Sequence, residues 1–404
     1  MINETLVQKD PAMLLEKVKQ LSASIFSKRA DHYDRTVTFP KENFEDLQKA
    51  GLLAAVISEE YGGHNIGHYN GDIYNLWMMT KEIAKSDMAF ARCWEGHNNS
   101  LTLLENIANA EQKNRWFEGV VERGEIWSAW SGEPQSPSKG EKQRFGTFLT
   151  EKEDGYLING TKVFCTSAPG ASWANLLVNT KGPGAARHSS SDDKSLLMLA
   201  CDLSDPSVSF DDSWWDPIGM KGSVSYMVSF NDTFIPKENL IGYPGQFLTE
   251  EWQTLFTPQY AATFLGGAEA AYEYTLSYIN KQNKGNDPYI QHRIAKMSLN
   301  IETANLWLRK TADLWKNNRI EEAKHAGSQT RYIVEKLAVE TVNHAIHACG
   351  ARSLVRPSSL ERIYRDLSFY IHHDNSDQVL AVIGKSILGL NRDRSFFEPD
   401  KSNN

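Results

Sequence analysis

The hydrophobic periodicity of this chain changes twice, and the order of the patterns limits the folds open to it. From Ala12 to about Arg123, apolar residues recur at the three- and four-residue spacing of amphipathic helices. From Trp127 onward, short runs rich in aromatic and β-branched residues are divided by Gly, Pro, Asp and Asn, which is typical of strands and turns. After the segment IPKENLIGYPG the helical spacing returns and continues to Gly389.

This order predicts an α+β fold that is mainly α. We expect an N-terminal helical domain over residues 1–126, a middle β domain of barrel or sandwich type over residues 127–240, and a C-terminal four-helix-type bundle over residues 241–404. Within the β domain, the aspartate and glycine of EDGYLING mark a hairpin. A chain of 404 residues is long enough to bury several cores.

The composition argues against several classes of partner. A formal net charge of −8 and a pI near 5.8 disfavour nucleic acid or an anionic membrane. No apolar run reaches the length of a membrane-spanning helix, and the first residues lack the layout of a signal peptide. The cysteines form no CxxC pair, which predicts reduced thiols in a cytoplasmic protein and no metal centre. They are Cys93, Cys165, Cys201 and Cys349.

The stretch 360–389 contains two helical stripes separated by a polar break, HHDNSD at residues 372–377. Asn375 or Ser376 can cap the second helix, which leaves backbone N–H groups facing whatever lies over the break. A carboxylate there, such as Asp374, could take a proton from a bound molecule. The alternative is a solvated loop without chemistry, which describes most polar breaks.

Two other sequence features say less about function. The glycine-rich segment Ser58–Asn70 has neither the spacing of a nucleotide-binding loop nor a preceding strand. His97 stands alone among polar neighbours, and we predict a hydrogen-bonded structural residue there.

Several short sequence words occur in a definite order along the chain. They are SEEYGG, SGEP, LINGTKVFCTSAP, IGMKGSVSYMVSFNDTFIPKENLIG and ACGARSLVRPSSLERIYRDLSFYIHHDNS. Each word is weak, but their order and spacing together resemble the acyl-CoA dehydrogenase superfamily of flavoproteins over nearly the whole chain. The resemblance implies an oxidoreductase whose cofactor is FAD, with FMN or a reduced flavin as alternatives.

The resemblance also assigns residues to the flavin. Thr166 stands where a hydroxyl and its backbone meet the flavin near N5, and Phe164, in place of the usual Trp, can pack against a ring. The resemblance further implies flavin contacts from the backbone of Trp130, Ser131 and Gly132 and from the side chains of Ser223, Ser225 and Ser376. Cys349, Gly350 and Ala351 stand where the glycine turn of a neighbouring subunit approaches the flavin. The alternative for these three residues is simple packing of a helix end.

Two chemistries are compatible with the resemblance. Asp374 falls on the Glu that is the catalytic base in many acyl-CoA dehydrogenases, where it would remove the substrate's α-proton while the β-hydride passes to flavin N5. This is CH–CH dehydrogenation of an acyl-CoA-like substrate. His373 falls on a histidine typical of the superfamily's two-component reduced-flavin monooxygenases, which use O2. A bystander role for His373 is its alternative.

The departures from the family pattern bear on this choice. The Asp-x-x-Arg of many members falls on residues 256–259, FTPQ, so a charged contact to acyl-CoA is lost. The Arg that meets the flavin pyrophosphate has no clear equivalent, and Lys281 or Lys284 would have to substitute. Gly132 replaces a flavin-contacting Thr.

We favour dehydrogenation slightly, because the triplet at residues 374–376 keeps both the carboxylate and the hydroxyl. The monooxygenase stays open, and so does a non-catalytic scaffold. The family implies a homotetramer or a dimer, and either an electron-acceptor flavoprotein or a flavin reductase as a partner.

Overall fold

The computed structural model describes residues 11–69, 72–134, 146–180 and 195–390. The part before the sheet is helical. Helix α5 begins where the Asp87 carboxylate accepts hydrogen bonds from the backbone of Ala89 and Phe90, and α6 begins with a capping box between Asn109 and Gln112. The helices are α1 (Pro11–Leu21), a π-helical turn (Ser22–Phe26), α2 (Ser27–Thr36), α3 (Lys41–Lys49), a 3₁₀ turn (Glu59–Tyr61), α4 (Ile73–Ser86), α5 (Met88–Ile107) and α6 (Ala110–Arg123).

The middle of the chain forms one eight-stranded sheet with the order β6-β7-β3-β2-β4-β5-β8, and β1 pairs with β4 in parallel. The predicted hairpin is confirmed, since β2 and β3 pair antiparallel with Glu151 opposite Tyr156. The strands are β1 (Trp127–Trp130), β2 (Phe148–Glu151), β3 (Gly155–Cys165), β4 (Trp173–Asn179), β5 (Leu196–Asp202), β6 (Val208–Asp211), β7 (Tyr226–Pro236) and β8 (Leu240–Ile241).

The part after the sheet is helical again, and three long helices dominate it. Helix α8 packs closely on α4, because Gly266 has no side chain: a Cβ there would lie 2.4 Å from the Lys81 carbonyl oxygen. The helices are α7 (Gln246–Thr249), α8 (Thr257–Lys281), α9 (Pro288–Lys316), α10 (Ile320–Cys349), α11 (Ser359–Tyr370) and α12 (Ser376–Ile387). Shorter 3₁₀ turns lie at Lys221–Ser223, Lys237–Asn239, Trp252–Leu255, Ala351–Leu354 and Ile371–His373.

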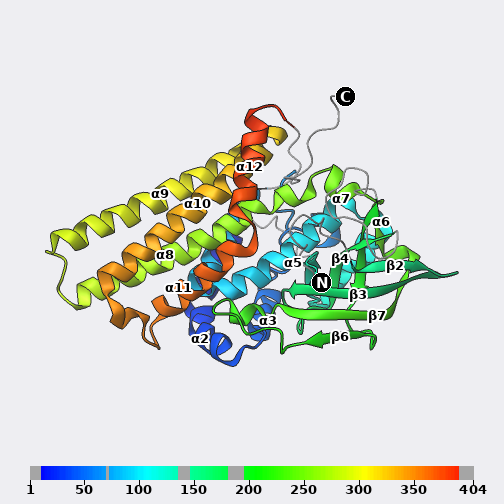
Figure 1. Ribbon diagram of the computed structural model, residues 1–404, viewed down its shortest axis with the longest axis horizontal. Coiled ribbons are helices and arrows are strands. Elements are labelled where there is room, and N and C mark those ends of the chain that lie inside the picture. Colours follow the sequence, from blue (N-terminus) through cyan, green and yellow to red (C-terminus); the bar gives the residue numbers. More distant parts are fainter. Residues whose placement is uncertain (1–10, 70–71, 135–145, 181–194, 391–404) are drawn as a thin grey trace, which may run out of the picture.

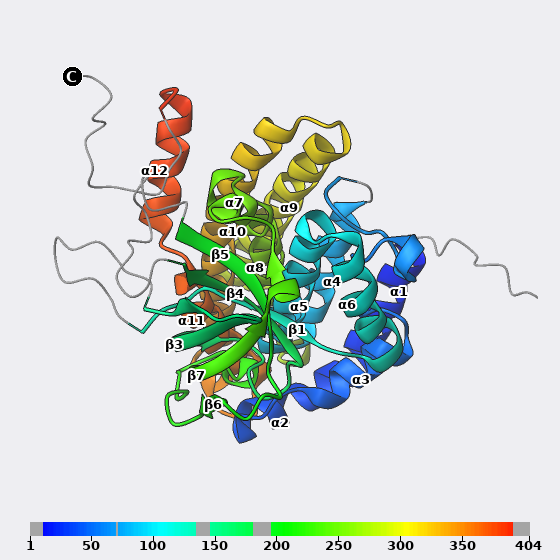
Figure 2. The ribbon, with the colours of Figure 1, turned by 90° about the vertical axis from the view of Figure 1, so that its right-hand side faces the viewer.

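The sheet lies at one end of the molecule and the long helices α8–α10 extend from the other, with α5 running between them (Figure 1). Figure 2 shows α1, α4, α5 and α6 together on one side of the strands. The largest buried cluster joins side chains of the N-terminal helices to those of the bundle, whereas the sheet has a separate core around Trp130 and Ile158. The predicted α+β, mainly helical fold is therefore confirmed.

The strands run from Trp127 to Ile241, next to the limits 127–240 that the sequence suggests for the β domain. The outer ends of the first and third predicted domains lie outside the described residues, so the three-domain division stays a prediction. Among the helices that are described, none is long and apolar enough to cross a membrane.

Candidate active site

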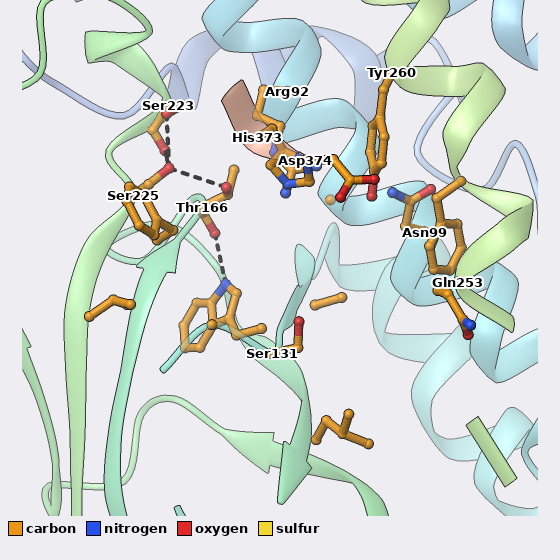
Figure 3. Close-up of a pocket in the computed structure, with 18 of the residues that line it drawn as sticks. Arg92, Asn99, Ser131, Thr166, Ser223, Ser225, Gln253, Tyr260, His373 and Asp374 are labelled. Carbon is orange, nitrogen blue, oxygen red and sulfur yellow. Dashed lines mark hydrogen bonds between the residues drawn. The ribbon is translucent and has the colours of Figure 1, made fainter. Parts of the chain in front are cut away.

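A cavity of about 970 Å³ lies where the sheet, α5, the start of α8 and the end of α11 meet. A volume of this size accommodates a large organic ligand. Asp374 and His373 face Thr166 and Ser131 across it, and Tyr260 and Asn99 lie on the side of the helices (Figure 3). The cavity thus joins the late polar break to the middle sheet.

Helix α5 forms one wall through Arg92, Gly96, Asn99 and Leu103, which line the cavity. Their spacing of four, three and four residues puts them on one face of the helix. Sequence reasoning missed Arg92 and Asn99. The signal in the sequence was the placing of Arg92, Gly96 and Asn99 at helical spacing within one predicted helix.

Hydroxyl groups line the opposite wall. The Thr166 hydroxyl lies 3.1 Å from the Ser225 hydroxyl, which lies 2.9 Å from that of Ser223. The Thr166 carbonyl oxygen accepts hydrogen bonds from the Ser128 hydroxyl at 2.8 Å and from the Trp130 indole N–H at 3.0 Å. All of the polar side chains in this group are buried, so hydrogen bonds fix both the hydroxyl and the carbonyl oxygen of Thr166, which directly follows β3.

An aromatic series follows from the sheet to α11. Phe164 adopts a left-handed backbone conformation (φ +55°) and keeps 52% of its surface exposed. Its ring lies edge-on to Trp214 at 4.7 Å, and Trp214 stacks on Trp215 at 6.3 Å. Trp215 in turn lies edge-on to Phe369 at 5.8 Å. An exposed aromatic ring held by rings on one side can receive another flat ring on the other.

The polar break is ordered by its own side chains. Asn375 caps α12 by accepting hydrogen bonds from the backbone of Asp377 and Gln378 at 2.9 and 3.3 Å, which confirms a cap at that position. The Asp374 carboxylate accepts a hydrogen bond from the Asn375 N–H at 3.0 Å. The His373 ring packs against Tyr260 at 4.8 Å and against Tyr370 at 5.5 Å, measured between ring centroids.

A fully buried carboxylate lies behind this wall. Glu95 accepts hydrogen bonds from the hydroxyls of Thr263 and Tyr370, and Arg92 lies 3.3 Å from it. Burial raises the pKa of the Glu95 carboxyl, although Arg92 and the hydrogen bonds oppose that shift. Burial likewise raises the pKa of the Tyr370 hydroxyl well above its usual value. This cluster fixes Arg92, which lines the cavity.

Two amide groups of the cavity wall have unused hydrogen-bonding capacity. The Oδ1 atom of Asn175 and the Oε1 atom of Gln253 are buried and accept no hydrogen bond from the described residues. Both oxygens are buried behind the cavity surface, so they are not counted as contacts for a bound molecule. The hydroxyls of Thr166 and Ser225 and the exposed Phe164 ring are the groups that fit a planar polar heterocycle.

The structure brings most of the predicted site residues to this one cavity and leaves four elsewhere. Cys349, Gly350 and Ala351 lie at the end of α10 and the following turn, with Gly350 and Ala351 exposed. The Ser376 hydroxyl donates to Glu335 at 2.7 Å. The residues that line the cavity are Trp130, Ser131, Gly132, Phe164, Thr166, Ser223, Ser225, His373 and Asp374.

His97 lies outside the cavity and has a structural environment. Its Nε2 lies 2.9 Å from the Leu53 carbonyl oxygen, and its Nδ1 accepts the Trp127 N–H at 3.1 Å. This confirms the predicted hydrogen-bonded structural role. Burial lowers the pKa of His97 to about 4, so the ring is neutral at pH 7. The four cysteines are buried free thiols.

Comparison with known proteins agrees with the fold and with the sequence words. Residues 8–124 match the acyl-CoA dehydrogenase N-terminal domain, and residues 258–383 match the acyl-CoA dehydrogenase C-terminal domain. The chain therefore belongs to the acyl-CoA dehydrogenase superfamily, and the predicted resemblance is confirmed.

The relatives within this superfamily differ in activity, although all those compared are named as oxidoreductases. A probable acyl-CoA dehydrogenase of Bacillus subtilis is 25% identical over 94% of this chain and 98% of its own length. A dibenzothiophene monooxygenase of Rhodococcus qingshengii is 24% identical over 85% of this chain and 86% of its own. The FMN-bound TdsC of Paenibacillus sp. A11-2 superimposes with a TM-score of 0.82 at 21% identity, covering 96% and 100% of the two chains.

Proposed function

We propose that this protein is a flavin-dependent oxidoreductase in which Asp374 removes an α-proton from an acyl-CoA-like substrate. The observation that carries the proposal is the shared cavity: a carboxylate from the late polar break and the Thr166 hydroxyl from the sheet line one space. A base and a redox ring must lie on opposite sides of one C–C bond for such a reaction, and two walls of one cavity offer that arrangement.

The residues of the wall fit a flavin. Phe164 offers an exposed ring for stacking, and the Thr166 and Ser225 hydroxyls can bind polar edges of a heterocycle. A flavin held by these residues would supply a hydride acceptor for the substrate β-carbon, and loss of the α-proton with that hydride would leave a new C=C bond in the product. FAD is the form we propose, because both matching domain families are those of acyl-CoA dehydrogenases. FMN is the alternative, since the structural neighbour TdsC is FMN-bound.

The chain's own residues would divide the remaining work. Asp374 takes the α-proton, because its carboxylate lines the cavity and sits beside a capped helix start. Arg92 and Asn99 face the same space from α5 and offer donors to a substrate carbonyl. Tyr260 and Phe369 supply apolar surface that excludes water from the reacting carbons.

The test uses the purified protein loaded with FAD under anaerobic conditions. Titration with butyryl-CoA and with palmitoyl-CoA should bleach the absorbance of oxidised flavin. Asp374→Asn should slow this reduction by roughly 10²–10⁴-fold, the usual contribution of a general base, while flavin content stays the same. Asp377→Asn is the matched control, because Asp377 is exposed and lies on the first turn of α12. Equal reduction rates in both variants would remove Asp374 from the role of base.

A second candidate is a two-component monooxygenase that takes up reduced flavin and uses O2. It is favoured by His373, which lines the cavity and packs against Tyr260 and Tyr370. It is also favoured by Phe256, which lines the cavity at the position of the Asp in the Asp-x-x-Arg that many relatives use to contact acyl-CoA. This candidate requires that neither acyl-CoA bleaches the flavin. It also requires His373→Asn to alter the course of flavin reoxidation by oxygen.

The partners follow from the same proposal. Electrons leave a dehydrogenase to an electron-acceptor flavoprotein, whereas a monooxygenase receives its reduced flavin from a reductase. We further propose a homotetramer or a dimer, in which Cys349, Gly350 and Ala351 of one copy approach the flavin of the other. The exposure of Gly350 and Ala351 leaves that turn accessible to a second copy.

A further inference from the structure

The short loop that carries His373 and Asp374 is attached to helix α10 at both of its ends. The preceding residue, Ile371, accepts a hydrogen bond through its carbonyl oxygen from Nη2 of Arg331 at 3.1 Å. The following residue, Ser376, donates its hydroxyl to Oε2 of Glu335 at 2.7 Å. Four residues, 372–375, therefore lie between two anchors on one helix.

The two anchors are a single buried ion pair. Arg331 donates through Nη1 to the Oε2 atom of Glu335, one helical turn further along α10. Their side chains are 0% and 3% exposed. The Arg331 guanidinium also lies over the Phe264 ring, 5.3 Å from its centroid. Packing on one face and the short helical spacing leave the pair little freedom to move.

The Glu335 carboxyl group stays ionised at neutral pH, so its ion pair with Arg331 is kept. Burial on its own raises the pKa of Glu335, but the hydrogen bonds from Arg331 and Ser376 outweigh it, and the pKa lies below the usual value. The carboxylate therefore remains an acceptor for the Ser376 hydroxyl across the neutral pH range. A charge-assisted hydrogen bond of this kind is stronger than a neutral one.

We propose that Arg331 and Glu335 are positioning residues that set the place of Asp374 and His373 in the cavity. Neither residue lines the cavity, so each acts through the loop. A base must be held within a fraction of an ångström of its target, and a four-residue loop free at either end would lose that geometry. This inference rests on the proposed function, because it assumes that the loop carries the reacting groups.

The sharpest perturbation is Ser376→Ala, which removes one hydroxyl at the start of α12 and leaves the buried ion pair intact. Ser376→Thr keeps the hydroxyl and should restore the wild-type behaviour. Lys336→Met is the matched control, because Lys336 also contacts Glu335, at 3.1 Å, but through a side chain that is 55% exposed. Such an exposed ion pair contributes little.

The first readout is amide hydrogen exchange, which does not depend on activity. The Asp377 and Gln378 amides donate to the Asn375 side chain, and the Val379 amide donates to the Asn375 carbonyl oxygen. We expect their exchange to accelerate about tenfold in Ser376→Ala, equivalent to ~1.4 kcal/mol of local opening. The second readout is flavin reduction by saturating butyryl-CoA, which should slow about tenfold with unchanged flavin content and unchanged thermal midpoint.

The outcomes separate this inference from the proposed function. Wild-type exchange at these amides in Ser376→Ala overturns the positioning role, whatever the activity. The role is also overturned if Lys336→Met or Ser376→Thr shows the same acceleration as Ser376→Ala. Faster exchange in Ser376→Ala together with normal flavin reduction in Asp374→Asn retains the anchored loop and overturns the base.

Discussion

Replacement of Lys162 by Met tests whether a buried ion pair supports the strand side of the cavity. The side chains of Lys162 and Glu133 are 0% and 2% exposed, and they pair directly. Lys162 also donates to the Leu177 carbonyl oxygen at 2.7 Å, which joins β3 to β4. Glu133 lines the cavity beside Gly132, so the pair lies immediately behind the residues that we assign to the flavin.

The magnitude follows from what the substitution leaves behind. Met keeps the length of the aliphatic chain, so no large cavity forms. Among the described residues, the donors that Glu133 retains are distant: the Gly146 N–H at 3.3 Å and the Thr147 hydroxyl at 3.4 Å. Breaking a buried pair by removing one partner costs about 3–5 kcal/mol, because the remaining charge is desolvated without compensation.

The assay is chemical denaturation followed by tryptophan fluorescence. Lys162→Met should lower the free energy of unfolding by about 3–5 kcal/mol. The double variant Lys162→Met/Glu133→Leu should recover most of that loss, because it removes the unpaired charge. Lys152→Met, at an exposed position of the β2–β3 turn, is the control and should change the free energy by less than about 1 kcal/mol. Equal effects of Lys162→Met and Lys152→Met would refute the reasoning.

Two further predictions concern a backbone contact and a proton. Gly132→Ala should destabilise the cavity wall and weaken flavin binding, because a Cβ there would lie 2.5 Å from the Val163 carbonyl oxygen. Calorimetry measures the loss of stability and flavin titration measures the loss of affinity, and unchanged values in both contradict the prediction. The pKa of His97 is about 4 in the folded protein and 6.5 in the unfolded chain. The contribution of the neutral ring to the free energy of unfolding is therefore complete above pH 6.5 and is lost as the pH falls towards 4. The stability advantage of wild type over His97→Phe should therefore shrink by about 3 kcal/mol between pH 7 and pH 4, and a pH-independent difference contradicts this.

The order of helical, β and helical parts was readable from the sequence because periodicity is a local property. The hairpin before Gly155 and the cap at Asn375 were readable for the same reason, since turn and cap chemistry depends on neighbours in the chain. His97 was correctly interpreted as structural. The family words added the expectation that Asp374 and Thr166 share a site, which periodicity alone does not provide.

The tertiary structure decided which residues complete that site. Arg92 and Asn99 reach the cavity only because α5 passes between the sheet and the bundle. The contact of Tyr370 with Glu95 joins residues 275 positions apart. The Ser376 hydroxyl, which the family pattern directs to the flavin, is directed to Glu335 by the packing of α12 on α10.

The class of each segment and the carboxylate at a capped helix start follow from residue spacing and from neighbours along the chain, so they can be predicted before the fold is known. The helix faces that line the cavity and the buried pairs behind its walls become visible only when the chain is folded. Those properties depend on contacts between distant segments, and burial there sets both the strength of an ion pair and the direction of a pKa shift.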